Sequence, residues 1–396
     1  MKKRLVSVIL LGWGLLLLIS GCQNPAPDNH SVDSSVGNLD LDTCAQTSGY
    51  RMAETEDGYF INLPNRLYYA DKADLTNWVP VCSEPYCNHS ESTCNSQMRS
   101  DEFYIKDGRI YTIRGSYFIH RNKPWSGQVV VSTMLDGSDR RAEFELEGSD
   151  LRDAGLSDAI LTPEYAYGQY YEMQNDGHFH ATLVRANEKG TEILAEQEVP
   201  ELSGWEYLET ANYWHDVRGN TCLLSTVAAE DEDAIFSGQK KLFHAVDSGL
   251  EEIDGIEEMS LYGAYWDGSA LYHYKSGDGY YKTDLSTGSS EKIMDAHPVG
   301  GMKYFLSPDF LMQSDYNIEA RRSHAEIAVY YDGGWKQISI PEELRALKEA
   351  SLDPLALSTD GVFFTVYDLE SNNYLLYRIP LDKDTDTAIF CGTFSF

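Results

Sequence analysis

Hydrophobic and polar residues alternate in short runs along most of the chain, a pattern typical of half-buried β-strands. Aromatic residues that favour strands are abundant, with 27 Tyr, 14 Phe and 7 Trp spread through these runs. Helical periodicity is scarce, and its clearest candidate is Glu342 to Glu349, directly after Pro341. The pattern therefore predicts an all-β fold with one short helix.

A phrase of Asp-Gly followed by an aromatic or aliphatic strand recurs along the chain. Clear copies begin at Asp57, Asp107, Asp267 and Asp360, and degenerate copies lie near Pro163, Arg218 and Ser307. The first and last copies are 303 residues apart across six intervals. The repeat is thus about 50 residues long, a little above typical propeller repeats.

A second phrase, a tight polar turn between two strands, follows the first in most repeats. These turns are Leu135–Ser138, Ala186–Gly190, Val246–Gly249, Asp284–Gly288, Tyr331–Gly334 and Leu381–Asp384. Asp, Asn and Gly suit such hairpins because they tolerate positive φ. Two hairpins make a four-stranded sheet that cannot bury both faces alone. Radial stacking of the sheets solves this, so residues 44–396 are predicted to form a β-propeller of about seven four-stranded blades.

The N-terminal residues have the pattern of a targeting segment. Three basic residues precede an apolar run from Leu5 to Ile19, which is too short for a typical membrane-spanning helix. The run ends in Ile19-Ser20-Gly21-Cys22, which resembles the bacterial lipobox. That resemblance implies a lipoprotein signal peptide at 1–21, removed to leave Cys22 carrying diacylglycerol with acyl chains such as palmitate. The alternatives are an ordinary signal peptide and an uncleaved membrane anchor.

Residues 22–43 are rich in Pro, Ser, Asn and Asp and predict a flexible, disordered tether between the lipid and the propeller. Removal of the signal peptide takes away three of the 31 basic residues and none of the 63 acidic ones, which leaves a formal charge of −35. This charge argues against nucleic acid as a partner. We therefore expect a protein held at the cell membrane by its lipid anchor and facing the extracytoplasmic side.

With its repeats and its lipobox, the chain resembles the bacterial extracytoplasmic β-propeller lipoproteins, a group that includes TolB-like and LDL-receptor-like propellers. The resemblance covers the chain from about Tyr50 to its end. Tyr213-Trp214-His215-Asp216 is similar to the Tyr-Trp-Thr-Asp element of the LDL-receptor class, although it occurs once and not in every repeat. The resemblance implies the propeller fold and an extracytoplasmic location. It implies no particular activity, since many functions share these repeats.

One group of residues has the composition of a covalent or metal-held staple: Cys82-x4-Cys87-x-His89-x4-Cys94. A disulfide suits an exported domain, and Cys44 is then a fourth partner for the three local cysteines. Three thiolates and one imidazole are also a complete tetrahedral set for a structural zinc. Free thiols are the third alternative. Apart from this zinc, the sequence predicts no cofactor.

The sequence contains no Gly-x-Ser-x-Gly elbow, no His-Glu-x-x-His motif and no phosphate-binding glycine loop. We therefore expect a non-catalytic propeller that binds a protein, peptide or glycan partner through the loops at its rim. One alternative is an enzyme that acts on a glycan or peptide at the central channel. The other is a scaffolding component of the cell envelope.

Overall fold

The computed structural model describes most of the chain after residue 50. The described ranges are 51–63, 65–89, 94–98, 103–114, 119–120, 123–124, 128–146, 155–161, 165–173, 179–199, 211–215, 222–228, 239–246, 249–253, 260–267, 269–275, 277–298, 301–315, 326–347, 350–382 and 385–395. They all belong to one compact unit, Asn38–Phe396. The predicted signal peptide, Cys22, the tether and Cys44 lie outside the described residues. Within these residues, no helix has both the length and the apolar character needed to cross a membrane.

Seven four-stranded antiparallel sheets follow one another along the described chain. The first has β1 (Met52–Glu54), β2 (Gly58–Asn62), β3 (Leu67–Asp71) and β4 (Val79–Pro80). The second has β5 (Phe103–Lys106), β6 (Arg109–Arg114), β9 (Gln128–Met134) and β10 (Arg141–Leu146). The third has β11 (Gly155–Leu161), β12 (Ala166–Met173), β13 (Phe179–Asn187) and β14 (Gly190–Val199). The fourth has β15 (Ala211–His215), β16 (Cys222–Ala228), β17 (Gln239–Val246) and β18 (Gly249–Ile253).

The remaining three sheets have the same consecutive order. The fifth has β19 (Ser260–Trp266), β20 (Ala270–Lys275), β21 (Gly279–Asp284) and β22 (Ser290–Asp295). The sixth has β23 (Met302–Ser307), β24 (Phe310–Ser314), β25 (Ile327–Tyr331) and β26 (Gly334–Ile338). The seventh has β27 (Ala350–Ser358), β28 (Gly361–Asp368), β29 (Asn373–Pro380) and β30 (Ile389–Ser395). Two further strands, β7 (Ile119–His120) and β8 (Lys123–Pro124), form a small hairpin between β6 and β9 that the sequence pattern did not predict.

The recurring sequence phrases mark the same positions in the sheets. Every copy of the Asp-Gly phrase, including the degenerate ones, falls between the first and second strands of a sheet. The carboxylate of Asp267 shows why, since it accepts hydrogen bonds from the backbone N–H groups of Ser269 (2.9 Å) and Ala270 (2.8 Å). Each polar turn falls between the third and fourth strands of the second to seventh sheets. The predicted repeats are therefore confirmed, with one repeat in each sheet.

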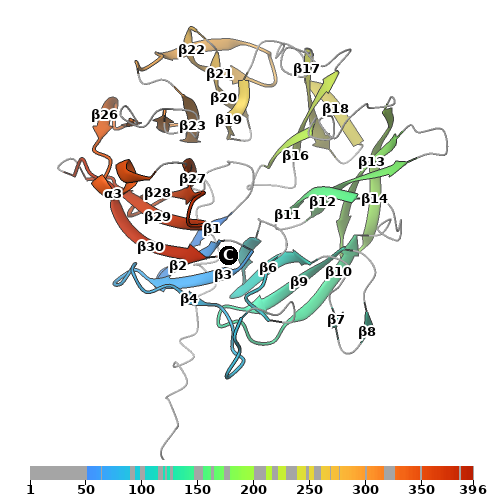
Figure 1. The fold of residues 1–396 in the computed structure, drawn as a ribbon. Coiled ribbons are helices and arrows are strands. Elements are labelled where there is room, and N and C mark those ends of the chain that lie inside the picture. Colours follow the sequence, from blue (N-terminus) through green and yellow to red (C-terminus); the bar gives the residue numbers. More distant parts are fainter. Residues whose placement is uncertain are drawn as a thin grey trace, which may run out of the picture. The chain divides into compact units, whose positions relative to one another are not determined.

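The sheets pack against one another in a closed series. β1 contacts β5, β6 contacts β11, β14 contacts β18, and β15 contacts β19. β19 then contacts β23, β23 contacts β27, and β27 contacts β1 again. Figure 1 shows the seven sheets following one another around a common centre. These contacts confirm a β-propeller, whose blades are numbered here one to seven in chain order.

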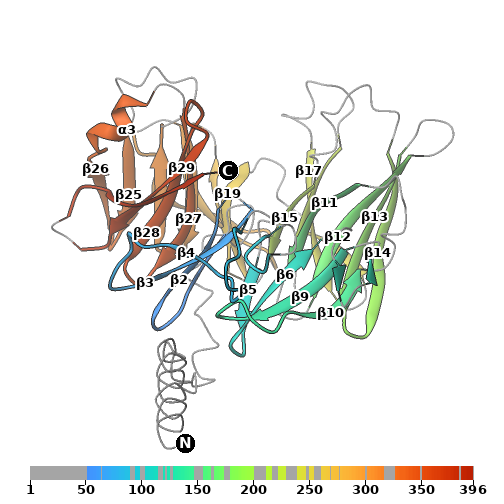
Figure 2. The same ribbon diagram turned by 60° about the horizontal axis from the view of Figure 1, so that its bottom comes forward.

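Among the described strands, blades one and seven each contain four consecutive strands, so the ring closes between them without an exchanged strand. Side chains hold this seam. The Tyr59 hydroxyl donates a hydrogen bond to Asp360 (2.6 Å), and its ring lies 4.9 Å from that of Phe363. The Trp78 indole N–H donates to the carbonyl of Cys391 at 3.1 Å. Figure 2 shows the blue strands of blade one beside the red strands of blade seven.

The predicted helix is present between blades six and seven as α3 (Glu342–Ala346), shorter than the sequence pattern indicated. Pro341 lies directly before it, and Leu344 is its buried residue. Leu344 belongs to a hydrophobic cluster with residues of both neighbouring blades, such as Phe310 of β24 and Phe364 of β28. The helix thus adds apolar contact to the interface between these two blades.

Candidate metal centre

Cys82, Cys87, His89 and Cys94, called here the Cys–His cluster, lie on the connection between β4 of blade one and β5 of blade two. The structure brings all four side chains together. One ligand atom of each lies within 4.8 Å of the ligand atoms of the other three. The Cys94 sulfur is buried and lies 3.5 Å from Nδ1 of His89. The other three side chains are half-buried.

An unusual backbone shapes the cluster on either side of Cys87. The described non-glycine residues with positive φ are Asn or Asp, except for Tyr86 (φ 64°) and His89 (φ 58°). At His89 this conformation directs the backbone N–H toward the sulfur of Cys87, which accepts it at 3.4 Å. The ring of the same residue contacts Cys94. A single left-handed residue thus directs two groups into the cluster, a use that accounts for its conformational cost.

The thiols differ in their electrostatic surroundings. Burial raises the pKa of Cys94, but hydrogen bonds from Ser96 and His89 outweigh it and lower the pKa to about 6. The backbone N–H of His89 lowers the pKa of Cys87, yet burial and the neighbouring Cys94 and Cys82 raise it overall to about 11. Three sulfurs at this spacing resist simultaneous ionisation, because each thiolate repels the next.

The cluster packs between blade one and the turn that joins β9 to β10 in blade two. The backbone N–H of Leu67, at the start of β3, donates to the carbonyl of Ser96 at 2.7 Å. On the other side, the carbonyl of Gly137 accepts hydrogen bonds from the Ser83 hydroxyl (3.3 Å) and the Asn95 amide. The guanidinium of Arg140 donates to the Asn95 side chain. Both blades therefore hold the segment in place.

Arg140 is also the nearby positive charge that the sequence analysis missed. Burial lowers the pKa of its guanidinium, while the charges of Cys94 and Cys82 act in the opposite direction. Arg140 lies 46 positions after Cys94 in the chain, so no local motif connects the two. Ser96, only two residues after Cys94, was also missed, and its short spacing was the available signal.

The other cysteines do not join the cluster within the described residues. Cys82, Cys87, Cys94 and Cys391 are free thiols. Cys391 is buried in β30, and burial raises its pKa to about 11. Cys222 opens β16, and its side chain is outside the described part of the structure. Pairing between the cluster and Cys44 stays a prediction.

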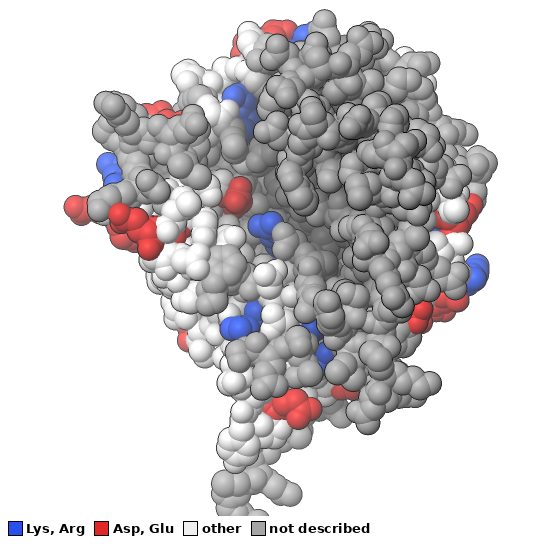
Figure 3. All heavy atoms as spheres, turned by 45° about the vertical axis from the view of Figure 1, so that its right-hand side comes forward, with Lys and Arg blue, Asp and Glu red and all other residues white. Residues whose placement is uncertain are grey.

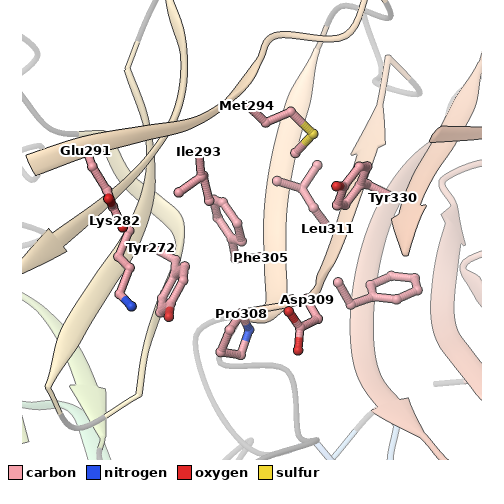
Figure 4. Close-up of a pocket in the computed structure, with 11 residues that line it drawn as sticks. Tyr272, Lys282, Glu291, Ile293, Met294, Phe305, Pro308, Asp309, Leu311 and Tyr330 are labelled. Atoms are coloured by element: carbon pink, nitrogen blue, oxygen red, sulfur yellow. The ribbon is translucent and has the colours of Figure 1, made fainter. Parts of the chain in front are cut away.

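A cavity of about 330 Å³ lies between blades five and six. Figure 4 shows Lys282, Tyr272 and Glu291 on one wall, and Asp309 and Tyr330 on the other. The Lys282 ammonium lies 5.6 Å from the centre of the Tyr272 ring. The volume is at the low end for small-molecule pockets. It lies between two blades and not at the central channel, where a propeller enzyme was expected to have its site.

Charged side chains of both signs are mixed over the described part of the surface in Figure 3. On the face shown in Figure 3, the described acidic residues lie in several separate groups with Lys and Arg between them. The described part of this face therefore presents no single patch of one sign. The strongly acidic composition acts there as a distributed charge, which favours solubility.

No protein-family model matches the chain, and no curated protein matches it. Among solved structures, it is similar to the β-propeller domain of the Trilobed protease from Pyrococcus furiosus, with 10% identity, a TM-score of 0.46 and coverage of 88% of this chain and 97% of that one. It is similar to the tricorn protease (9% identity, TM-score 0.49), covering 88% of this chain but 34% of the protease chain. It is also similar to an oligogalacturonate lyase from Vibrio parahaemolyticus, with 12% identity, a TM-score of 0.48 and coverage of 86% and 91%. At such low similarity, the fold assignment rests on the strand order and the contacts between blades.

Proposed function

We propose that this chain is a lipid-anchored, extracytoplasmic β-propeller that binds a protein, peptide or glycan partner and catalyses no reaction. The anchor is supported by the sequence Ile19-Ser20-Gly21-Cys22 after an apolar run, and by the polar tether that follows it. The binding role is supported by one feature of the connection between blades one and two, the turn that carries Tyr86.

Glu84, Pro85, Tyr86 and Cys87 form a tight turn closed by a hydrogen bond from the Cys87 N–H to the Glu84 carbonyl (3.3 Å). Pro at the second position and positive φ at the third are the features of a type II turn, which normally has glycine third. Here the third residue is Tyr86, whose φ is 64° and whose side chain is fully exposed. The fold gains no packing from this ring in return for the unfavourable backbone conformation.

An aromatic side chain in this position is best explained by a contact outside the chain. Tyrosine is enriched at interfaces because it offers a rigid apolar ring together with a hydroxyl that can hydrogen-bond. Tyr86 lies between Ser83, whose hydroxyl donates to the carbonyl of Gly137 in blade two, and Cys87, which belongs to the Cys–His cluster. A side chain on such a fixed turn loses little conformational freedom on binding, which favours affinity. We therefore assign Tyr86 as the central residue of the partner-binding surface.

Substitution of Tyr86 by Gly separates a binding role from a structural one. Glycine adopts positive φ without strain, so Tyr86→Gly should leave the free energy of unfolding unchanged or raise it by up to about 1 kcal/mol. Loss of an interface hot spot should weaken partner binding by at least about tenfold. Stability is measured by denaturant unfolding of the purified protein. Binding is measured with a photo-reactive amino acid at position 86 of the full-length protein in its own envelope.

Leu369, exposed on a turn of blade seven, is the matched control position for the photo-reactive residue. We expect one discrete adduct from position 86 and none from position 369. In the same cells, Cys22→Ala should abolish fatty-acid labelling and block cleavage at this site. Equal adducts at both positions would refute the assignment of Tyr86, and fatty-acid labelling of Cys22→Ala would refute the anchor.

A further inference from the structure

We propose that Cys82, Cys87, His89 and Cys94 bind one zinc ion in a closed structural site. This inference goes beyond partner binding and does not depend on it. Three thiolates and one imidazole complete a tetrahedral shell, which leaves no open position for substrate. Sulfur-rich tetrahedral sets of this kind select zinc over harder ions such as Mg²⁺ and Ca²⁺.

The spacing of the ligand atoms fits a tetrahedral zinc. Zinc bonds of about 2.3 Å to sulfur and about 2.0 Å to nitrogen give edges of about 3.5 Å between S and N and about 3.8 Å between two S atoms. The observed separation between Cys94 Sγ and His89 Nδ1 is 3.5 Å, equal to the first edge. All other pairs lie within 4.8 Å. Side-chain rotations that move a ligand atom by about 1 Å or less therefore complete the tetrahedron.

Hydrogen bonds around the cluster already resemble those of a zinc–thiolate centre. The Ser96 hydroxyl lies 3.0 Å from the Cys94 sulfur, and the backbone N–H of His89 donates to Cys87. Such contacts orient the ligands and stabilise sulfur in its ionised form. Zinc with three thiolates has a net charge of −1. The positive charge of Arg140, which interacts electrostatically with Cys94 and Cys82, balances this negative charge.

A disulfide explains less of this geometry. Even if the third local cysteine pairs with Cys44, disulfides leave the imidazole of His89 converging on the sulfurs without a role. The left-handed backbone at His89 directs both its N–H and its ring toward the sulfurs, a convergence that zinc ligation explains directly. Zinc accounts for all four donors and for His89 together.

The site would fix the connection between blades one and two. Its ligands span 82–94. The flanking residues Val81 and Ser96 bond to Leu67 of blade one, and Ser83 bonds to Gly137 of blade two. Zinc cross-links four points of this segment, so it limits the motion of the turn that carries Tyr86. Binding of the metal should therefore stabilise the interface of these two blades more than the other interfaces.

The test uses the full mature chain, purified without added metal or reductant, and begins with elemental analysis. We expect about one zinc per chain. Thiol titration after denaturation in chelator should then find all three cluster cysteines free. Exchange with Co²⁺ should give the sulfur-to-cobalt charge-transfer bands and the intense visible bands of a tetrahedral thiolate site.

His89→Ala should lower zinc retention during dialysis against a chelator by at least about tenfold. His297→Ala is the matched control, because His297 is a half-buried histidine next to Trp335 in another part of the propeller. It should retain zinc like the wild type. Circular dichroism confirms that each variant is folded, and the cobalt spectrum of the wild type decides the question if His89→Ala does not fold.

Three results would overturn the proposal. The first is a metal-free protein with cluster cysteines in disulfides, with one another or with Cys44, located by mass spectrometry of unreduced peptides. The second is a metal-free protein with all thiols free. The third is a zinc content that His89→Ala and His297→Ala retain equally. None of them would affect the experiments on lipid attachment and Tyr86, so the two proposals fail separately.

Discussion

Substitution of Gly137 by Ala tests how tightly the Cys–His segment packs on blade two. Gly137 lies in the turn between β9 and β10 with φ +79°, a conformation that favours glycine. A Cβ atom at this position would lie 2.6 Å from the carbonyl oxygen of Val81 and 2.9 Å from Cα of Cys82. Both are backbone atoms, so no side-chain rotation can relieve the clash.

The expected loss of stability has two parts. Alanine in the left-handed region costs about 1 kcal/mol relative to glycine. In addition, the backbone at Val81 and Cys82 must move by several tenths of an ångström, and such overpacking typically costs about 1–3 kcal/mol. Gly137→Ala should therefore lower the free energy of unfolding by about 2–4 kcal/mol. It should also accelerate zinc loss, because Cys82 is one of the proposed ligands.

Gly108 supplies a matched control within the same blade. It lies in the turn between β5 and β6 with φ +70°, and a Cβ there would have no neighbour within 4 Å. Gly108→Ala should thus show the backbone cost alone, about 1 kcal/mol. Denaturant unfolding, monitored by tryptophan fluorescence, gives the free energy of unfolding of both variants. If the two variants lose the same stability and retain zinc equally, the segment is not packed against Gly137, and the reasoning is refuted.

Two further predictions concern the core. His273 is buried beside the Thr283 hydroxyl (2.9 Å), and burial lowers its pKa from 6.5 to about 4. As the pH falls, the unfolded chain therefore takes up a proton at His273 before the folded chain does. The free energy of unfolding should decrease by up to about 3 kcal/mol between pH 6.5 and 4. His273→Gln should remove that part of the pH dependence, as measured by urea unfolding at each pH. Phe363→Ala, beside Tyr59 at the seam, should cost about 3–5 kcal/mol and make blade one sensitive to limited proteolysis. Phe364→Ala, a buried control facing blade six, should lose similar stability without that cleavage, and equal cleavage of both would contradict a side-chain seam.

The sequence was sufficient to predict the repeat because its turn chemistry is local. Asp107-Gly108 adopts positive φ at both residues and forms the turn between the first two strands of blade two, and Asp267 bonds the backbone N–H groups of the corresponding turn in blade five. The position of the four cluster ligands within 13 residues was equally local, so their composition alone indicated a staple. These features depend on a few consecutive residues, which is why pattern and spacing located them.

The missed features depend on contacts between distant segments. Gly137 and Arg140 approach the cluster only because blade two packs against blade one, and no sequence pattern links either residue to the cluster. The closure of the ring without an exchanged strand was also not predictable, since strand count alone allows either arrangement. Likewise, the significance of Tyr86 is evident only from its φ and its full exposure, because Glu-Pro-Tyr-Cys by itself is an ordinary turn sequence.

The Cys–His cluster lies directly after the short outer strand of blade one. Its outer strand, β4, has only two residues and pairs with β3 at Tyr68 and Tyr69 alone, whereas the outer strands of the other blades have five to ten residues. One of the two residues is Pro80, which has no N–H to donate. Beyond β4, backbone hydrogen bonds to blade one flank the cluster: the N–H of Val81 donates to the carbonyl of Leu67 before it, and the carbonyl of Ser96 accepts from the N–H of Leu67 after it. A zinc bound directly after the short strand β4 would add a restraint between these hydrogen bonds, and would hold Tyr86 in position as a consequence.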